Sequence, residues 1–322
     1  MPAIMGLSTP MTQGKTMVED VTDLIVNVDY KSTPFYSALA ESTATNTLHS
    51  WLTDTYAASA DNAAAEGNDL VFTDAVVASR RSNIVQLFQK DIRVSNTEMR
   101  VAHYGMGDPY TYQLQKKLVE MARDIEKALI AGTTASGDSG VARRLNGAIA
   151  LITTNKTARN SGTSLSETEF NDILAGIYDS GTDVNVDKAF LGSSLKRVVS
   201  GYTAGSTKFT DADGKRLYNT VSIYESDFGV VSLHLEREVP TTAGNKGILL
   251  IDSSKWRVSY LSGGRPQHMP LATIGSAKRG MLEAELTLEA LNEKSSAYRS
   301  GYVWVYKLTC TQGTLERGCF CL

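Results

Sequence analysis

Two strand-like runs in the first third of the chain are joined by a connection that is too long for a compact domain. The runs cover residues 45–56 and 80–95, and the residues between them, 57–79, are mostly small or polar. A connection of that length without secondary structure is usually functional or disordered. A two-stranded ribbon alone is at best marginally stable in water. We therefore predict a long hairpin arm that needs a surface to lie on, and we expect another protein chain to provide it.

The composition is that of a globular protein. Of 322 residues, 42% are hydrophobic and 21% are charged, which is enough for a large core. The net charge is −3 and the pI is about 5.9, which argues against a dedicated nucleic-acid-binding domain, whose pI usually exceeds ~9. No apolar run approaches the ~18 residues of a membrane helix, and the first residues lack the apolar core of a secretory signal. All three cysteines (Cys310, Cys319 and Cys321) lie near the C-terminus, so no disulfide framework is expected in the body of the protein.

The strongest helical signal covers residues 109–131. Asp108 is a good N-cap, and Pro109 is tolerated in the first turn. Apolar residues then recur at helical spacing, and Gly132 ends the pattern. At ~1.5 Å per residue this helix is over about 30 Å long.

Further elements follow in the second half of the chain. Ser166 and Glu169 form a capping box in front of a second helix. A buried strand is expected at 188–191 and a short helix at 194–201. Short apolar runs at 230–235 and 247–251 are typical of inner strands, and Asp213-Gly214 between these segments is a hairpin turn signal. Near the end of the chain, leucine or alanine alternates with glutamate or threonine over residues 282–289, which predicts a half-exposed strand with an acidic outer face.

The segment Thr33-Pro34-Phe35-Tyr36 has two interpretations. Pro34 disfavours helical geometry at the residue before it, so the segment could be an extended arm that Phe35 and Tyr36 anchor to a surface. Proline is equally at home in the first turn of a helix. The sequence leaves both open.

The chain contains little that resembles catalytic chemistry. Gly137-Asp138-Ser139-Gly140 is similar to the sequence around the nucleophile of trypsin-like proteases, but Val141 follows and no histidine has a matching context. Asp211-x-Asp213-Gly214 lacks the acidic residue that closes a calcium loop. The histidines are scattered without metal-ligand spacing, and no phosphate-binding or dinucleotide-binding glycine motif occurs. We expect no catalytic, cofactor-binding or metal-binding residue.

Three ordered motifs resemble the major capsid proteins of tailed bacteriophages. They are Thr33-Pro34-Phe35, the TNTLHSW run at 45–51, and TLEALNEK at 287–294, with YQLQKKLVEMARDIEKALI at 112–130 between them. The resemblance extends from about residue 20 to 305. The tail after residue 308 matches no family ending.

The resemblance implies an α+β protein with the capsid fold that tailed phages share with the herpesvirus capsid floor, the Johnson fold. Its parts would be an N-terminal arm (1–43), an extended E-loop (44–97), a peripheral domain (98–159) with a spine helix (109–131), an axial domain (160–262), return strands of the peripheral domain (263–307) and a C-terminal tail (308–322).

The resemblance also implies a function and partners. The chain would be a major capsid protein, not an enzyme, that self-assembles into hexamers and pentamers of an icosahedral head around double-stranded DNA. Its partners would be copies of itself, a portal protein, a separate scaffold protein, decoration proteins and packaged DNA contacted non-specifically, with no membrane. It would be made in the host cytoplasm and reside in the virion. The alternatives are another phage structural protein or a hydrolase that uses Ser139.

The expected intersubunit contacts are residues of the arm, the hairpin and the spine helix. The arginines would pair with acidic residues of a neighbour such as Glu120 or Asp124. Some proteins of this fold crosslink through an E-loop lysine, but residues 57–79 contain none, so we expect a non-covalent shell. The predicted contact residues are Phe35, Trp51, Arg80, Arg81, Lys90, Glu120 and Asp124.

Overall fold

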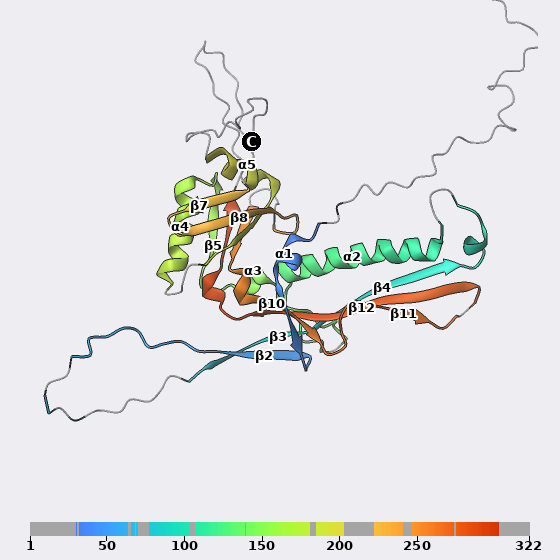
Figure 1. Cartoon of the computed structure of the whole chain (residues 1–322), viewed down its shortest axis with the longest axis horizontal. Helices are drawn as coiled ribbons and strands as arrows, with labels where there is room; N and C mark the ends of the chain where they lie inside the picture. Colours follow the sequence, from blue (N-terminus) through green and yellow to red (C-terminus); the bar gives the residue numbers. More distant parts are fainter. Residues whose placement is uncertain are drawn as a thin grey trace, which may run out of the picture. The chain divides into compact units, whose positions relative to one another are not determined.

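The computed structural model has mixed helices and sheets (Figure 1). It describes residues 30, 32–63, 66–67, 69, 77–103, 107–138, 140–180, 185–202, 222–240, 246–273 and 275–302. Ser139, the Asp211-x-Asp213-Gly214 segment and the three cysteines lie outside this part of the chain. No described helix is long and apolar enough to cross a membrane.

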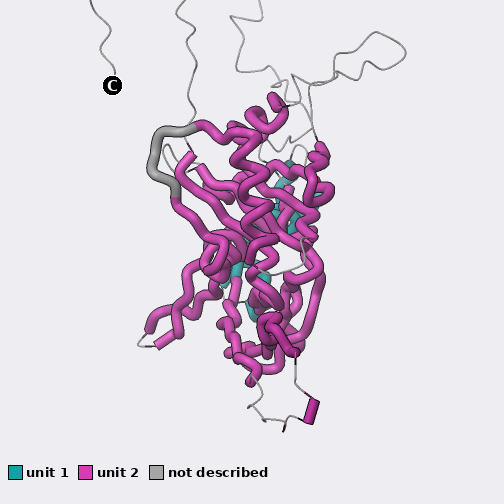
Figure 2. Tube along the Cα trace, turned by 90° about the vertical axis from the view of Figure 1, so that its left-hand side faces the viewer, with its two compact units in different colours: residues 1–31, 89–121, 268–282 teal, residues 32–88, 122–267, 283–322 magenta. Residues whose placement is uncertain are grey.

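The chain divides into two compact units, coloured separately in Figure 2. The first comprises residues 1–31, 89–121 and 268–282. The second comprises residues 32–88, 122–267 and 283–322.

A five-stranded sheet contains β1 (Ala40–Ala44), β10 (Trp256–Leu261), β12 (Ala277–Ala290) and β11 (Gln267–Leu271), and β4 (Gln86–Ser95) also pairs with β12. β1 runs parallel to β10, and β10 runs antiparallel to β12. Along β12 the side chains alternate between buried and partly exposed as far as Leu286, as the sequence predicts. The prediction is wrong beyond that point, because Thr287 and Glu289 are also buried.

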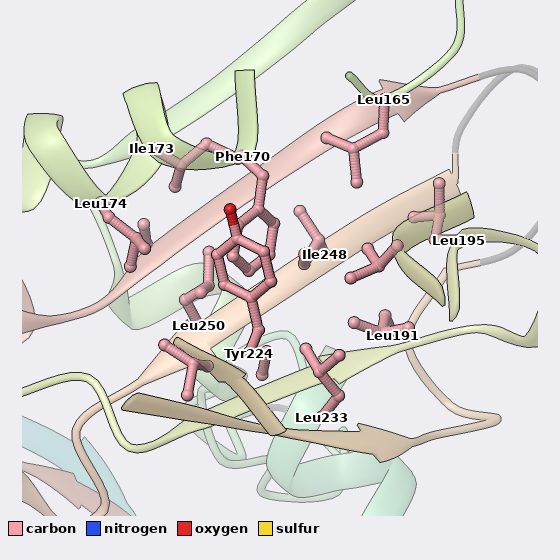
Figure 3. Close-up of a cluster of buried hydrophobic side chains, with 14 of the residues drawn as sticks. Leu165, Phe170, Ile173, Leu174, Leu191, Leu195, Tyr224, Leu233, Ile248 and Leu250 are labelled. Atoms are coloured by element: carbon pink, nitrogen blue, oxygen red, sulfur yellow. The ribbon is translucent and has the colours of Figure 1, made fainter. Parts of the chain in front are cut away.

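A six-stranded sheet contributes to a cluster of buried apolar side chains in the second unit. Its order is β5 (Lys156–Thr163), β13 (Ala297–Tyr302), β9 (Lys246–Ile251), β6 (Lys188–Leu191), β8 (Gly229–Leu235) and β7 (Ile223–Ser226). Helices α4 (Glu167–Asp179) and α5 (Ser193–Tyr202) contribute side chains to this cluster. At its centre Phe170 meets Tyr224 edge-on, with ring centroids 4.9 Å apart (Figure 3).

The helices confirm the local signals of the sequence. Helix α2 (Pro109–Ala131) begins where the Asp108 carboxylate accepts hydrogen bonds from the backbone N–H of Thr111 (3.2 Å) and from its hydroxyl (2.5 Å). The Thr111 hydroxyl lowers the pKa of Asp108. Helix α4 begins at the predicted capping box, with the Ser166 hydroxyl accepting from the N–H of Glu169.

The remaining elements of the described residues are short. They are α3 (Ala148–Leu151) and the 3-10 turns Glu98–Arg100, Ser253–Lys255 and Glu293–Ser295. Helix α1 (Pro34–Ala38) settles the alternative that the sequence left open, because Pro34 stands at the start of a helix and not in an extended arm.

The predicted hairpin is shorter than the sequence suggests. Strands β2 (Leu48–Thr53) and β3 (Ser79–Ile84) form a separate antiparallel two-stranded sheet. The second run, expected as one strand over 80–95, breaks at Val85, whose N–H donates to the carbonyl of Thr47 (2.8 Å). Beyond the break, β4 joins the five-stranded sheet. Phe88, Ile92 and Val94 are separated by even numbers of residues, so they lie on one face of the strand, and all three are buried.

Candidate assembly interface

The root of the hairpin is attached to its own subunit by Trp51. This side chain is 8% exposed, and its indole Nε1–H donates to the carbonyl oxygen of Ala290 at the end of β12 (2.8 Å). A buried indole needs such an acceptor, since its N–H would otherwise be left without a partner. Trp51 therefore holds β2 against the five-stranded sheet.

Asn83 attaches the opposite strand in the same way. Its Nδ2 donates to the carbonyl oxygens of Leu288 (2.8 Å) and Asn146 (3.0 Å). Its Oδ1 accepts from the N–H groups of Asn146 (2.8 Å) and Ile84 (2.9 Å). All of the hydrogen-bonding capacity of one buried amide is thus used to fix β3.

A buried carboxylate lies next to this attachment. Oε2 of Glu289 accepts from the hydroxyls of Ser42 (3.1 Å) and Ser259 (3.3 Å), and His49 Nε2 lies 3.7 Å from it. Ser42, Ser259 and Glu289 belong to β1, β10 and β12, and His49 belongs to the hairpin. The network therefore joins the hairpin to three strands of the sheet.

Two of the motifs singled out in the sequence meet here. His49 and Trp51 come from the TNTLHSW run, and the groups that they contact come from TLEALNEK. We call this joint, made of His49, Trp51, Asn83 and residues 288–290, the hairpin root.

The other face of the hairpin exposes large apolar side chains. Leu48 and Leu52 alternate with the buried side of β2 and are 52% and 71% exposed. Beyond the paired strands, Tyr56 and Val77 are also exposed. Arg80 pairs opposite Leu52 in the hairpin register, so these two side chains share the outward face. Exposed apolar side chains on an arm with no core of its own are typical of a contact surface.

Comparison with known proteins shows the family of the chain. The SU10 major capsid protein family matches residues 4–301. The chain belongs to this family. It is also 25% identical to the major capsid protein of Escherichia phage Phieco32, over 83% of this chain and 89% of that protein. It is therefore a shell subunit of the icosahedral capsid of a tailed-phage virion, and copies of it assemble with one another.

Solved structures show the same fold. The capsid protein of a native GTA particle matches with a TM-score of 0.62 at 13% identity, covering 92% of this chain and all of that one. The capsid of Myoviridae phage XM1 matches with a TM-score of 0.59 at 12% identity, covering 88% and 96%. The SrpI encapsulin of Synechococcus elongatus PCC 7942 matches with a TM-score of 0.58 at 11% identity, covering 97% and 99%. The expected Johnson fold is confirmed.

Two of the residues predicted to contact a neighbouring subunit are instead part of the subunit's own interior. Phe35 is fully buried and meets the ring of Phe190 edge-on at 5.3 Å. Trp51 belongs to the hairpin root. Both predictions are wrong for the same reason. An aromatic side chain next to an arm suggests an anchor for a neighbouring subunit, but each of these side chains has its partner in its own chain. Trp51 donates to the carbonyl of Ala290, and Phe35 packs on Phe190.

The remaining predicted contact residues lie at least partly at the surface. Arg80 and Arg81 are exposed on β3, and Asp124 is exposed on α2. Glu120 already has a partner, since its carboxylate lies 2.9 Å from Lys117 Nζ, and the hydrogen bond from Lys117 lowers the pKa of Glu120. Lys90 is half-buried and adds to that lowering through its charge.

In the described part of the chain, no group of three or more His, Cys, Asp or Glu side chains is placed to hold a metal ion. The family implies a structural role.

Sequence reasoning missed Asn83 and Glu289, which the structure places at the root. The alternation along β2 could have shown that Leu48 and Leu52 share a face opposite Trp51.

Proposed function

We propose that the β2–β3 hairpin and the connection between its strands are the E-loop of this capsid subunit and lie across a neighbouring subunit of the same hexamer or pentamer. The outward exposure of Leu48, Leu52, Tyr56 and Val77 supports this proposal. The root fixes the base of the arm, so the exposed apolar side chains reach out in a defined direction. Weak contacts repeated around a closed shell add up through multivalency.

The other parts of the subunit follow from the same proposal. The five-stranded sheet and α2 correspond to the peripheral domain and its spine helix, and the six-stranded sheet to the axial domain near the capsomer axis. The family implies further partners for the finished head: a portal protein, a scaffold protein, decoration proteins and double-stranded DNA held inside. Synthesis in the host cytoplasm fits the absence of cysteine from residues 1–309.

The outward face of the hairpin can be tested by substitution. A double variant, Leu52→Asp with Tyr56→Ser, should fold and remain soluble but fail to form shells, as seen by electron microscopy and sedimentation. Circular dichroism should match that of the natural chain, because both side chains are exposed. Deletion of residues 58–78 should have the same outcome.

A matched control is Val141→Ser, which removes an exposed apolar side chain outside the hairpin. It should assemble normally. Shells of normal yield from the double variant would refute the proposed contact.

The two arginines of β3 give the contact an electrostatic part. We expect Arg80 and Arg81 to pair with acidic residues of the neighbour, with Glu120 or Asp124 as candidates. Exposed pairs contribute only ~0–1 kcal/mol each, so they would set register more than strength. Reversing both charges to glutamate should change the salt dependence of assembly, and an unchanged dependence would count against the pairing.

The contact should be non-covalent, because residues 57–79 contain no lysine. Boiled particles should run as single chains of 34.8 kDa on a denaturing gel. A ladder of crosslinked multimers would contradict this expectation.

A further inference from the structure

Two glutamates of the second unit are buried against each other. Glu126 of α2 is 1% exposed, and Glu236, which follows β8, is 4% exposed. Two ionised carboxylates in contact inside a protein repel each other and lose their hydration. Such a pair is stable when it retains a proton.

Glu126 acts as a cap for a helix to which it does not belong. Its Oε1 accepts the N–H of Phe35 and its Oε2 accepts the N–H of Tyr36, both at 2.7 Å. These are among the N–H groups at the start of a helix that lack a partner within it. The residue at the N-cap position of α1, Thr33, makes no side-chain cap. The carboxyl of Glu126 therefore takes over the role that a local cap would have.

Glu236 has a matching arrangement. Its Oε1 accepts the N–H groups of Arg237 (2.8 Å) and Glu238 (3.0 Å). Its Oε2 is buried and receives no hydrogen bond from a protein donor in the described chain. A hydrogen bond links its carboxyl to that of Glu126, so Oε2 is the oxygen left for that contact.

The surrounding charges do not remove the need for a proton. Burial, and next the hydrogen bond with Glu236, raise the pKa of Glu126 to about 9. His234, two residues before Glu236, stacks on the ring of Phe190, and burial together with Lys188 and Lys196 lowers its pKa, so it is neutral near pH 7. Arg123, one turn before Glu126, is half-buried, Glu238 is half-buried and Arg237 is exposed.

We propose that Glu126 and Glu236 share one proton and form an alkali-sensitive latch on the start of α1. While the proton is present, one carboxyl donates to the other and both keep their backbone donors. Loss of the proton leaves two buried carboxylates facing each other, which favours release of α1. Because β1 and the hairpin follow α1 directly in the chain, the latch links protonation to the segment that leads into the assembly arm.

The direction of the pH dependence follows from the number of bound protons. Between the ordinary glutamate pKa of about 4.5 and about 9, the folded pair binds one proton that the unfolded chain has released. Raising the pH over this interval should therefore increase the unfolding equilibrium constant by about tenfold per pH unit. Above about pH 9 the folded pair also loses its proton, and this contribution becomes constant.

Glu236→Gln tests the latch with little change in shape. The amide of the glutamine can donate permanently to Glu126 while its oxygen retains the bonds from Arg237 and Glu238. Urea unfolding of the full-length subunit should then lack the tenfold-per-unit term between about pH 5.5 and about pH 8.5. Glu126→Gln should behave differently and lose stability at every pH, because an amide NH2 would face the N–H of Phe35 or Tyr36.

Glu225→Gln, at an exposed position of β7, is the matched control and should leave the pH dependence of the natural chain unchanged. Infrared spectra provide a second measurement that does not depend on unfolding. The natural chain should show a protonated carboxyl band near pH 7.5 that Glu236→Gln lacks. Equal pH slopes for the natural chain and Glu236→Gln, or the absence of that band, would overturn the proposal.

Discussion

In the β2–β3 hairpin and in the six-stranded sheet, apolar side chains that share one face of a strand have opposite surroundings. In the sheet, Leu191, Ile248 and Leu250 belong to one cluster with side chains of α4 and α5, and all three are fully buried (Figure 3). In the hairpin, Leu48 and Leu52 are more than half exposed. Alternation shows which residues share a face, but not what covers that face. The sheet is covered by its own chain, whereas we propose that a neighbouring subunit covers the hairpin.

The largest difference between the two regions is expected when one large side chain is removed from the core of the six-stranded sheet and one from the hairpin. Phe170→Ala opens a cavity in the core beside Tyr224 and should cost about 3–5 kcal/mol of unfolding free energy. Leu52→Ala should change that free energy by less than about 0.5 kcal/mol, because the side chain is exposed. Urea unfolding measures both.

The yield of shells per folded subunit should show the opposite order of effects, with the larger loss for Leu52→Ala and the smaller loss for Phe170→Ala. Leu52→Ala should lower the yield of shells although the subunit is stable. If Leu52→Ala instead destabilised the subunit as much as Phe170→Ala, the contrast between the two regions would fail.

A second test concerns the hairpin root. Asn83→Ala leaves buried N–H and carbonyl groups at Asn146 and Leu288 without their partner, and should cost about 2–4 kcal/mol. It should also reduce shell formation, because the arm loses its fixed base while its outward face is unchanged. Ser82→Ala, on the exposed side of the same strand, is the control and should change neither. If Asn83→Ala had the unfolding free energy of the natural chain, the hydrogen bonds of Asn83 would contribute nothing to stability.

The third test lies in the first unit, where a glycine of β12 permits close packing. The side chain of Tyr110 occupies the space that a Cβ at Gly280 would need, and its hydroxyl is hydrogen-bonded to His268 Nε2 (2.8 Å). Gly280→Ala should therefore destabilise the subunit by about 1–3 kcal/mol. Adding Tyr110→Phe removes the oxygen nearest to the added Cβ and leaves His268 Nε2 at 2.7 Å and the ring carbon of residue 110 at 3.3 Å. The double variant should therefore recover part of the loss, but not all of it. If the losses of unfolding free energy in the two single variants simply added up in the double variant, the proposed close packing would be contradicted.

The smallest expected effect concerns Glu293, whose carboxylate accepts the N–H groups of Thr153 (2.9 Å) and Thr154 (3.1 Å) and the Thr154 hydroxyl (2.6 Å). Burial opposes its ionisation, but these hydrogen bonds outweigh burial and lower its pKa. Its contribution to stability should be complete above the ordinary glutamate pKa and should be lost as the pH falls through the lowered one. Glu293→Gln should flatten the acid limb of the urea midpoint against pH, whereas Glu225→Gln should not.

Local features of the fold could be read from the sequence. The bounds of α2 and α4 follow from caps and apolar spacing, which involve residues within a few positions of one another. The break at Val85 could not be predicted, because it depends on which sheet each half of the run joins. Glu289 was expected on an outer acidic face, and it is buried because Ser42, Ser259 and His49 lie over it.

The candidate interface was predictable as an arm but not as a set of contacts. Length and polarity identified the hairpin, whereas Trp51 was misassigned because its acceptor lies 239 residues further along the chain. The latch between Glu126 and Glu236 joins a helix to the end of a strand more than a hundred positions away, and no local pattern signals it.

The distance along the chain between the two halves of the hairpin root has a consequence for synthesis. Trp51 must wait for Ala290, 239 residues later, before its indole has an acceptor. At ~5–20 residues per second of translation, that delay is roughly 10–50 s. A nascent chain that does not yet include Ala290 therefore cannot fix the base of its hairpin through Trp51. Readiness to assemble therefore requires translation at least as far as Ala290, which would keep shorter chains out of the growing shell.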